Sequence, residues 1–415
     1  MKKRISSISA LLVAVSISLC GCSLPEESVK EATEFLNDNG EVTAESDAAA
    51  SLSSEVVVIN DLFEPLLEEK AASEASTESA TEASTEETEA PAEDDGRDHE
   101  VNIVFFGDSQ LANGRDDGTS IANFMQSRIP YSRIYNMAIG GSSASLEQST
   151  SSASAENMTS TCFLGMAYCF AGKSDRNATL AEKHPSILET MNSINPADVD
   201  YYFISYGTND FLNQAPLDVS VYSSENEKAH ALYNSIATAI ETLKAISPEA
   251  HFIIMTPFYG LYVSPDGTYI GDSYIVSNGV GTLAQYADKV KNVAEDKGEI
   301  LFDGMYGSKF DLYLDTASEY LMDNLHLSLT GRQIVARLLA HEVNFREDNE
   351  PYAYCETDFV KIAEFDPDEY YRYDEGQMKS YFPESWEKYI KGTFPLAQPS
   401  QEALDAYQAE QENGG

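Results

Sequence analysis

Cysteine is scarce in this chain, with five among 415 residues, which is too few for a disulfide framework. Cys20 and Cys22 lie close to the N-terminus, which leaves Cys162, Cys169 and Cys355. If Cys162 and Cys169 share a helix, they lie two turns and roughly 10 Å apart, beyond the reach of a disulfide. They also lack the close pairing and histidine partners of a zinc site. We therefore expect buried free thiols.

Basic residues are also few, with 26 Lys and Arg against 69 Asp and Glu, for a net charge of −43. A general nucleic-acid binder is excluded, because phosphate contacts need a basic surface. About a third of the acidic residues lie between Ser23 and Glu100, in a segment rich in Ser, Thr and Ala. The stretch 71–93 has almost no apolar side chains to bury. We expect residues 22–99 to form a disordered acidic tether.

No hydrophobic run is long enough to span a bilayer comfortably. The longest N-terminal run, Ile8 to Leu19, follows the basic Met1–Arg4 and has the length of a secretory signal. Residues 19–22 (Leu-Cys-Gly-Cys) resemble the lipobox of bacterial lipoproteins, whose last cysteine carries lipid. We therefore expect a signal peptide over 1–21, a lipid on Cys22, and an extracytoplasmic protein anchored to the bacterial cell membrane. The alternative is an ordinary signal peptide with two incidental cysteines.

From Val101 onward, apolar runs of strand length alternate with helical stretches. This alternation predicts an α/β domain over 100–346, a three-layer αβα sandwich with a mostly parallel central sheet. The segment Ser142–Ala197 is long for one crossover, so we expect an insertion with extra helices or a lid. Residues 347–415 are aromatic and acidic and form a C-terminal extension. The predicted strands are 101–106, 133–139, 201–206, 252–255 and 299–302, and the clearest helices are 227–246, 282–295 and 331–345.

One serine stands directly after the first strand of this domain. Gly107-Asp108-Ser109 would hold the Ser109 hydroxyl exposed on a rigid turn, with its backbone N–H available to an oxyanion. The same tripeptide recurs as Gly271-Asp272-Ser273, where it is more typical of a turn in a loop. Only the first copy closes a strongly apolar strand, so position favours Ser109. The Gly-x-Ser-x-Gly elbow of ordinary α/β-hydrolases does not occur in the chain.

Of the six histidines, only His326 has an aspartate three residues ahead of it, Asp323. A serine hydroxyl is a poor nucleophile until an imidazole accepts its proton, and a carboxylate then fixes the tautomer of that imidazole. An Asp-x-x-His turn could present both side chains to one cleft. The alternative is that His326 is simply a residue at the start of the last helix.

Two further blocks end apolar strands. They are Asn136-Met-Ala-Ile-Gly140-Gly141 and Gly207-Thr-Asn209-Asp. Glycine lets the backbone approach a substrate, and the side chain of Asn209 offers N–H donors to a developing negative oxygen. Ordinary strand-end turn chemistry would also explain both blocks.

Taken together and in this order, the four blocks resemble the SGNH hydrolase family of GDSL-like esterases, over roughly residues 102–345. The resemblance implies a flavodoxin-like fold, Ser109 as nucleophile, His326 as base and Asp323 as its partner. It implies an oxyanion hole of Ser109, Gly141 and Asn209, with Gly140 as an alternative to Gly141. Gln110 stands where many relatives have leucine, which bears on substrate preference rather than on the reaction.

These observations predict a serine esterase that needs no metal or organic cofactor. Its substrate would be a small acyl ester, acetyl above all, on extracellular or envelope carbohydrate, as the family resemblance suggests. One alternative is an O-acyltransferase on the same fold, in which a sugar hydroxyl replaces water. The other is a non-catalytic carbohydrate-binding lipoprotein that uses the aromatic C-terminal extension as a sugar platform. An intact set of Ser, Gly, Asn and Asp-x-x-His residues counts against the second alternative.

Overall fold

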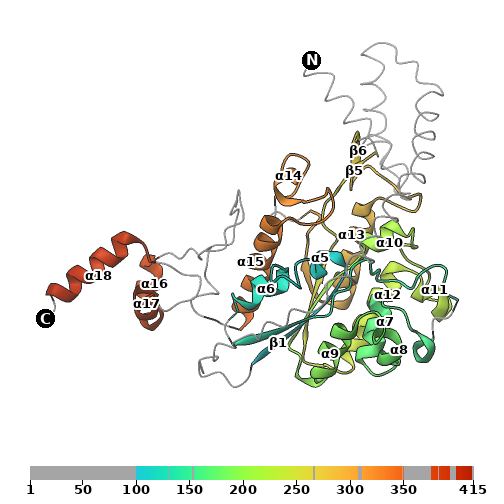
Figure 1. The fold of residues 1–415 in the computed structure, drawn as a ribbon, viewed down its shortest axis with the longest axis horizontal. Helices are drawn as coiled ribbons and strands as arrows, with labels where there is room; N and C mark the ends of the chain where they lie inside the picture. Colours follow the sequence, from blue (N-terminus) through green and yellow to red (C-terminus); the bar gives the residue numbers. More distant parts are fainter. Residues whose placement is uncertain are drawn as a thin grey trace, which may run out of the picture. The chain divides into compact units, whose positions relative to one another are not determined.

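Five parallel strands form the central sheet of the domain (Figure 1). The computed structural model describes residues 100–349 except 130, 152–153, 265–266, 307–310 and 348, and residues 375–413 except 382 and 393–398. The sheet strands are β1 (Val101–Gly107), β2 (Ser132–Asn136), β3 (Tyr201–Ser205), β4 (His251–Met255) and β7 (Ile300–Phe302). The first and last residues of each strand lie within about three positions of the bounds predicted from its apolar run.

The strand order β2-β1-β3-β4-β7 places β1 between β2 and β3. Phe105 pairs with Asn136 on one side and with Phe203 on the other. Because all neighbours are parallel, the segments that follow β1, β2 and β3 leave the sheet at the same edge. This edge is where ligands meet doubly wound sheets. The predicted α/β fold with a parallel sheet between helical layers is confirmed.

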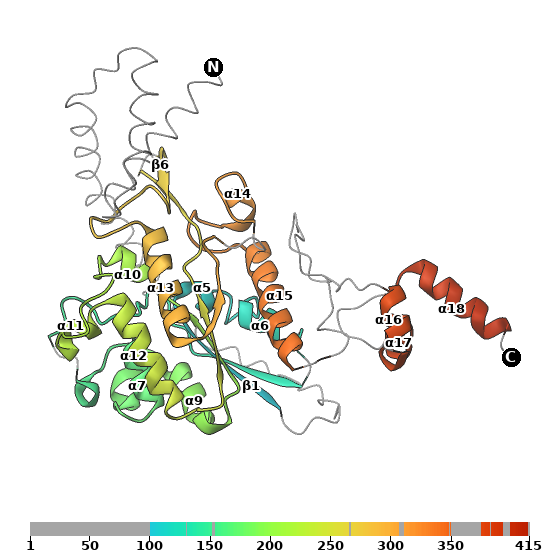
Figure 2. The same cartoon turned by 180° about the vertical axis from the view of Figure 1, so that it is seen from behind.

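Helices cover both faces of the sheet, as Figures 1 and 2 show from opposite sides. On one face α6 packs against α15, and on the other α12 contacts both α7 and α13. The first pair is α6 (Ile121–Gln126) and α15 (Leu329–Arg346), and the second group is α7 (Phe163–Phe170), α12 (Leu232–Lys244) and α13 (Leu283–Lys297). The predicted apolar face of the last helix is confirmed, since Ile334, Val335, Leu338 and Leu339 are all buried.

Aromatic side chains fill the interior between β1, β3 and α7. Phe106 lies 5.7 Å from Phe163 and 5.9 Å from Phe170, measured between ring centroids. Tyr202 stacks on Phe106 at 6.2 Å and on Phe252 at 4.9 Å. All of these rings are almost completely buried, so they hold β1 and β3 rigidly beneath the segments that follow them.

The insertion after β2 carries the extra helices that its length predicts. They are α7, α8 (Arg176–Leu180) and α9 (Pro185–Ser193), with short 3₁₀ turns at Ala155–Asn157 and Pro196–Asp198. Because Phe163 and Phe170 of α7 lie in the core, this helix belongs to the layer that covers the sheet and not to a lid.

Where we expected one helix over 227–246, the chain forms two, α11 (Glu225–Ala229) and α12. The imidazole of His230 hydrogen bonds to the carbonyl of Asn226 at 2.6 Å and to that of Thr150 at 2.9 Å. The backbone N–H of Leu232 donates to the carbonyl of Pro216. The contacts with Thr150 and Pro216 tie the break to distant segments of the chain.

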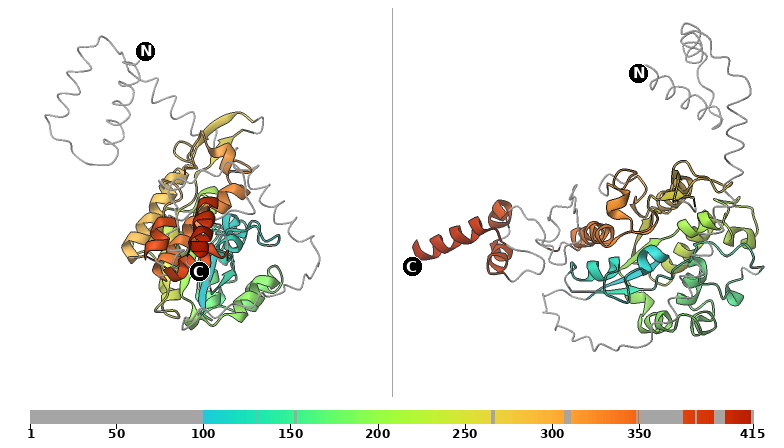
Figure 3. Two further views of the ribbon diagram at one scale, coloured as in Figure 1. Left: turned by 90° about the vertical axis from the view of Figure 1, so that its left-hand side faces the viewer. Right: turned by 45° about the horizontal axis from the view of Figure 1, so that its top comes forward.

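Shorter elements lie near the carboxyl ends of the strands. They are α5 (Ser109–Ala112), α10 (Thr208–Leu212), α14 (Ala317–Tyr320) and the antiparallel hairpin of β5 (Leu261–Val263) and β6 (Tyr269–Asp272). Figure 3 shows the hairpin and α14 at one end of the domain. The backbone N–H of Leu261 donates to the carbonyl of Asn324 at 2.8 Å, so the hairpin braces the segment before α15.

The C-terminal extension contains α16 (Glu375–Tyr381), α17 (Pro383–Ile390) and α18 (Gln401–Asn413). Trp386 packs in a cluster of C-terminal residues that includes Met378, Tyr389 and Ile390. Only 8% of its surface is exposed, so this tryptophan offers no open platform to a sugar. Among the described helices, none is long and apolar enough to cross a membrane. The predicted signal peptide, Cys22, the tether over 22–99 and Cys355 lie outside the described residues.

Candidate active site

Ser109 is the first residue of α5, directly beyond the carboxyl end of the central strand β1. The side chain of Asp108 caps this helix by accepting the N–H of Gln110 at 2.9 Å. Within the described part of the chain, the backbone N–H of Ser109 has no hydrogen-bond acceptor. Ser109 therefore presents both its hydroxyl and an N–H without an acceptor at the edge of the sheet.

A chain of two hydrogen bonds joins the three residues of the predicted triad. The Ser109 Oγ lies 2.8 Å from Nε2 of His326, and Nδ1 of His326 lies 2.6 Å from Oδ2 of Asp323. Ser109 and His326 are 217 positions apart in the sequence, so only the fold brings them together. The distances are those of good hydrogen bonds, in the order in which a serine, a base and a carboxylate act.

The Asp-x-x-His turn is held by its own aspartate. Oδ1 of Asp323 accepts the N–H groups of Leu325 at 3.2 Å and of His326 at 2.7 Å. Asn324 between them has φ of 69°, a left-handed conformation that asparagine tolerates better than most residues. Burial acts to raise the pKa of Asp323, but the hydrogen bond and charge of His326 and the two N–H groups lower it below its usual value. The carboxylate therefore stays ionised beside the imidazole.

The doubled glycine after β2 forms a tight turn. Ser142 donates its N–H to the carbonyl of Ile139 at 3.2 Å, and Gly141 has φ of 74°, which favours glycine. Neither Gly140 nor Gly141 has an acceptor for its backbone N–H among the described residues. Both glycines thus present N–H groups on the loop beside β1.

Asn209 lies in the first turn of α10, directly after β3, and is buried. Its Nδ2 donates to the carbonyl of Ser142 at 3.0 Å and lies 3.4 Å from Oδ2 of Asp108. The second contact is long for an N–H···O hydrogen bond. The side chain of Asn209 therefore contacts the residue after Gly141 and the residue before Ser109, so the three loops that carry the predicted oxyanion hole meet here.

Asp108 is a buried carboxylate beside the nucleophile candidate, and the sequence reasoning gave it no role. Burial raises its pKa to about 6, although the N–H of Gln110 and the nearby His326 act in the opposite direction. Asp108 can therefore change charge in the pH range in which a histidine does.

A second buried carboxylate, Asp210, shapes the loop after the glycines and was also missed. It accepts the N–H groups of Ala144 at 2.8 Å and of Ser145 at 2.9 Å, and the hydroxyl of Ser145 at 2.6 Å. Desolvation raises its pKa despite these bonds. The only signal in the sequence was its place directly after Asn209, at the end of an apolar strand.

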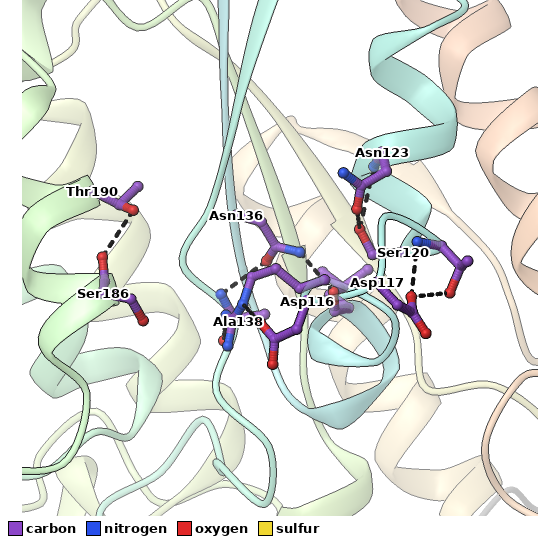
Figure 4. Close-up of polar contacts among 11 residues, drawn as sticks. Asp116, Asp117, Ser120, Asn123, Asn136, Ala138, Ser186 and Thr190 are labelled. Carbon is purple, nitrogen blue, oxygen red and sulfur yellow. Dashed lines mark hydrogen bonds and ion pairs between the residues drawn. The ribbon is translucent and has the colours of Figure 1, made fainter. Parts of the chain in front are cut away.

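Asn136, which opens the glycine block, supports the loop from the other side. Its side chain donates to the carbonyl of Leu111 at 2.8 Å and accepts the N–H of Ala138 at 3.1 Å (Figure 4). We had expected this strand to continue to Ile139, but β2 ends at Asn136. The N–H of Ile139 still bonds to the carbonyl of Gly107, so the loop continues to run beside β1.

The second Gly-Asp-Ser copy has different surroundings. Gly271 and Asp272 belong to strand β6, where we had expected a loop turn. Ser273 is completely buried, and its hydroxyl hydrogen bonds to the backbone of Gly260 and to no histidine among the described residues. It has neither access to a substrate nor a base.

Cys162 and Cys169 are buried free thiols at the start and end of α7, as their spacing predicts. Burial raises the pKa of Cys162 to about 12, so this thiol is unreactive at neutral pH. In the part of the chain that the structure describes, no group of three or more His, Cys, Asp or Glu side chains could hold a metal ion.

Comparison with known families decides the class of this protein. The model of the GDSL-like Lipase/Acylhydrolase family matches residues 103–339, more than half of the chain. The chain belongs to this family. It is an enzyme that acts on ester bonds, with the fold and the block order expected of a GDSL-like hydrolase.

Several solved structures are similar to this GDSL-like hydrolase. A possible lipase from Chitinophaga pinensis is 17% identical, and the match covers 60% of this chain and 99% of that one with a TM-score of 0.40. An acetyl xylan esterase from Geobacillus stearothermophilus is 17% identical, with coverage of 59% and 95% and a TM-score of 0.36. A member of the lipolytic G-D-S-L family from Veillonella parvula is 15% identical, with coverage of 59% and 99% and a TM-score of 0.37. No curated protein matches the chain.

Proposed function

We propose that this GDSL-like hydrolase is a serine esterase that removes small acyl groups, acetyl above all, from carbohydrate through an acyl-enzyme on Ser109. The observation that carries the proposal is the pair of hydrogen bonds from Ser109 to His326 and from His326 to Asp323, at 2.8 and 2.6 Å. A serine so placed has both a base for its proton and a carboxylate to stabilise the imidazolium that forms.

In the first half of the reaction, Oγ of Ser109 attacks the ester carbonyl carbon while Nε2 of His326 takes the hydroxyl proton. The carbonyl oxygen becomes an oxyanion, which accepts hydrogen bonds from the N–H groups of Ser109 and Gly141 and from Nδ2 of Asn209. Of the two contacts of Asn209 Nδ2, the one with Oδ2 of Asp108 is the weaker, at 3.4 Å. The N–H that makes this contact is therefore the one that we expect to bind the oxyanion. Collapse of the intermediate expels the alcohol, which receives the proton from His326.

In the second half, His326 takes a proton from water, and the hydroxide attacks the acyl-enzyme. The same oxyanion hole stabilises the second tetrahedral intermediate, and collapse returns the proton to Ser109 and releases the acid. Asp323 keeps Nδ1 of His326 protonated throughout, because its lowered pKa leaves it ionised.

A large alcohol group suits the openness of the site. The side chains of His326 and Asp323 are 24% and 41% exposed, so the base is reached from solvent rather than through a tunnel. The hydroxyls of Ser142, Ser143 and Ser145 donate to protein acceptors, so polar contacts to a sugar come from other groups. Acetyl is the acyl group that we propose, since no long apolar stretch follows Ser109 in the sequence to line a fatty-acyl channel.

We also propose that the enzyme works outside the cytoplasmic membrane. The basic N-terminus, the short apolar run and the Leu-Cys-Gly-Cys segment support a lipid on Cys22, with residues 22–99 as a tether. A tethered esterase of this kind meets the polymers of the cell surface.

Substrate preference is tested by comparing nitrophenyl acetate, butyrate and palmitate, and then by acetate release from acetylated xylan and from O-acetylated peptidoglycan. We expect the acetyl ester to be hydrolysed fastest and at least one polymer to lose acetate. Fastest turnover of palmitate, with no acetate from either polymer, would instead assign a lipase-like role. An assay with a sugar acceptor in place of water distinguishes hydrolysis from acyl transfer.

A further inference from the structure

Gln110 follows the nucleophile directly and is a buried polar residue, with 4% of its surface exposed. Its side chain reaches across to the segment that carries the base. Nε2 donates to the carbonyl of Leu325 at 2.8 Å, and Oε1 accepts the N–H of Leu327 at 3.1 Å. Both polar atoms of this amide are therefore paired with the two neighbours of His326.

These two bonds hold the base from one side in the way that a neighbouring strand would. On the other side, the N–H of Met322 donates to the carbonyl of His326 at 2.9 Å, and Leu321 pairs with Leu327 in an antiparallel bridge. The backbone of His326 is thus fixed along both edges. The position of its ring relative to Ser109 depends on both contacts.

Gln110 gives a short connection between the backbones of the nucleophile and the base, through its own side chain. Gln110 follows Ser109 directly in the chain. Its backbone N–H donates to the side chain of Asp108, which caps α5. A leucine at this position would have no donor or acceptor for Leu325 and Leu327.

We infer that Gln110 is a positioning residue that sets the distance from the base to the nucleophile by clamping the backbone on both sides of His326. This inference rests on the proposed function, because it concerns the same serine and histidine. A displacement of a catalytic group by about 1 Å can lower a rate on the order of a hundredfold. The role of Gln110 is therefore visible in turnover and not only in stability.

The test uses the full-length chain with Gln110→Met, which keeps the length of the side chain but has no amide, and with Gln110→Leu. The matched control is Asn344→Leu. Asn344 is also a buried amide with two hydrogen bonds, to Arg128 and Asn349, but it lies near the other end of α15. For each protein we would measure kcat and KM on nitrophenyl acetate, the rate of labelling by a fluorophosphonate, and hydrogen exchange at the Leu327 N–H.

In both Gln110 variants we expect kcat to fall on the order of tenfold or more with KM within roughly twofold, since substrate binding is not the step affected. Labelling should slow by a similar factor, and the Leu327 N–H should exchange faster. Asn344→Leu should lower the melting temperature but leave kcat and labelling of the folded protein unchanged.

Unchanged kcat and labelling in folded Gln110→Met would overturn the inference, as would an equal loss in Asn344→Leu. Failure of the proposed function has a different signature, namely a wild-type protein that neither hydrolyses the ester nor takes up the probe. In that case exchange at Leu327 still decides whether Gln110 holds this segment, because that measurement needs no activity.

Discussion

At the scale of single residues, two groups beside Ser109 bear on the activity at acidic pH. His326 must be neutral to accept a proton, and an imidazole titrates near roughly pH 6.5. The buried Asp108 has its pKa raised to about 6 and loses its negative charge below that pH. Asp323 does not contribute, because its pKa is lowered and it stays ionised through this range. Protonation of either His326 or Asp108 occurs as the pH falls.

We predict that kcat/KM falls about tenfold per pH unit below roughly pH 6.5, because the protonated imidazole is inactive as a base. The pH profile of nitrophenyl acetate hydrolysis checks this. Asp108→Asn separates the two groups, since it removes one titration and leaves the other. The acidic limb should persist in this variant, whatever its absolute rate. A limb that disappears with the aspartate would assign the titration to Asp108 instead.

The three residues of the triad could be found in the sequence because each stands at a fixed place relative to an element. Ser109 follows the first strand, and the Asp323–His326 pair precedes the last helix. The contacts of Gln110 could not be found in this way, since its partners lie 215 and 217 positions away. Nothing local to Gln110 indicates that its amide faces a backbone segment.

At the scale of elements, the loop between Gly141 and α7 depends on one buried carboxylate at the start of α10. The side chain of Asp210 accepts hydrogen bonds from two backbone N–H groups and one hydroxyl of this loop. It therefore ties the segment after β2 to the segment after β3. The residues that Asp210 holds follow the turn of Gly141 closely in the chain.

Asp210→Ala should destabilise the protein by about 3 kcal/mol, since it leaves buried N–H groups without partners. Urea unfolding followed by fluorescence measures the loss. The matched control is Asp218→Ala, which removes a surface ion pair with Lys289 and should cost less than about 1 kcal/mol. Equal effects of the two substitutions would mean that Asp210 does not organise the loop.

Strands were easier to predict than the breaks between helices. The three inner strands β1, β3 and β4 are nearly continuous apolar runs, because they are covered on both faces. The break between α11 and α12 depends on the carbonyl of Thr150, 80 positions from His230, which no helical periodicity reveals. The β5–β6 hairpin was also missed, because its strands of three and four residues carry little pattern.

At the scale of the whole molecule, a net charge of −43 on 415 residues repels the chain from other acidic surfaces. The lipid that we propose on Cys22 would oppose this repulsion and hold the protein at the membrane.

Cys22→Ser should release the protein from membranes, because one thiol is the proposed site of the lipid. Fractionation of cells that express each form, followed by a high-salt wash, measures this. Cys20→Ser is the matched control and should leave the protein in the membrane fraction. A Cys22→Ser protein that still sediments with membranes after the wash would show that the lipobox interpretation is wrong.

The central claim, that Ser109 is the nucleophile of an esterase, is tested most directly by fluorophosphonate labelling of matched serine variants. Wild type and Ser273→Ala should take up the probe and hydrolyse nitrophenyl acetate, since Ser273 is buried without a histidine partner among the described residues. Ser109→Ala should do neither, while circular dichroism shows a folded protein. Hydrolysis at the wild-type rate by folded Ser109→Ala would contradict the account.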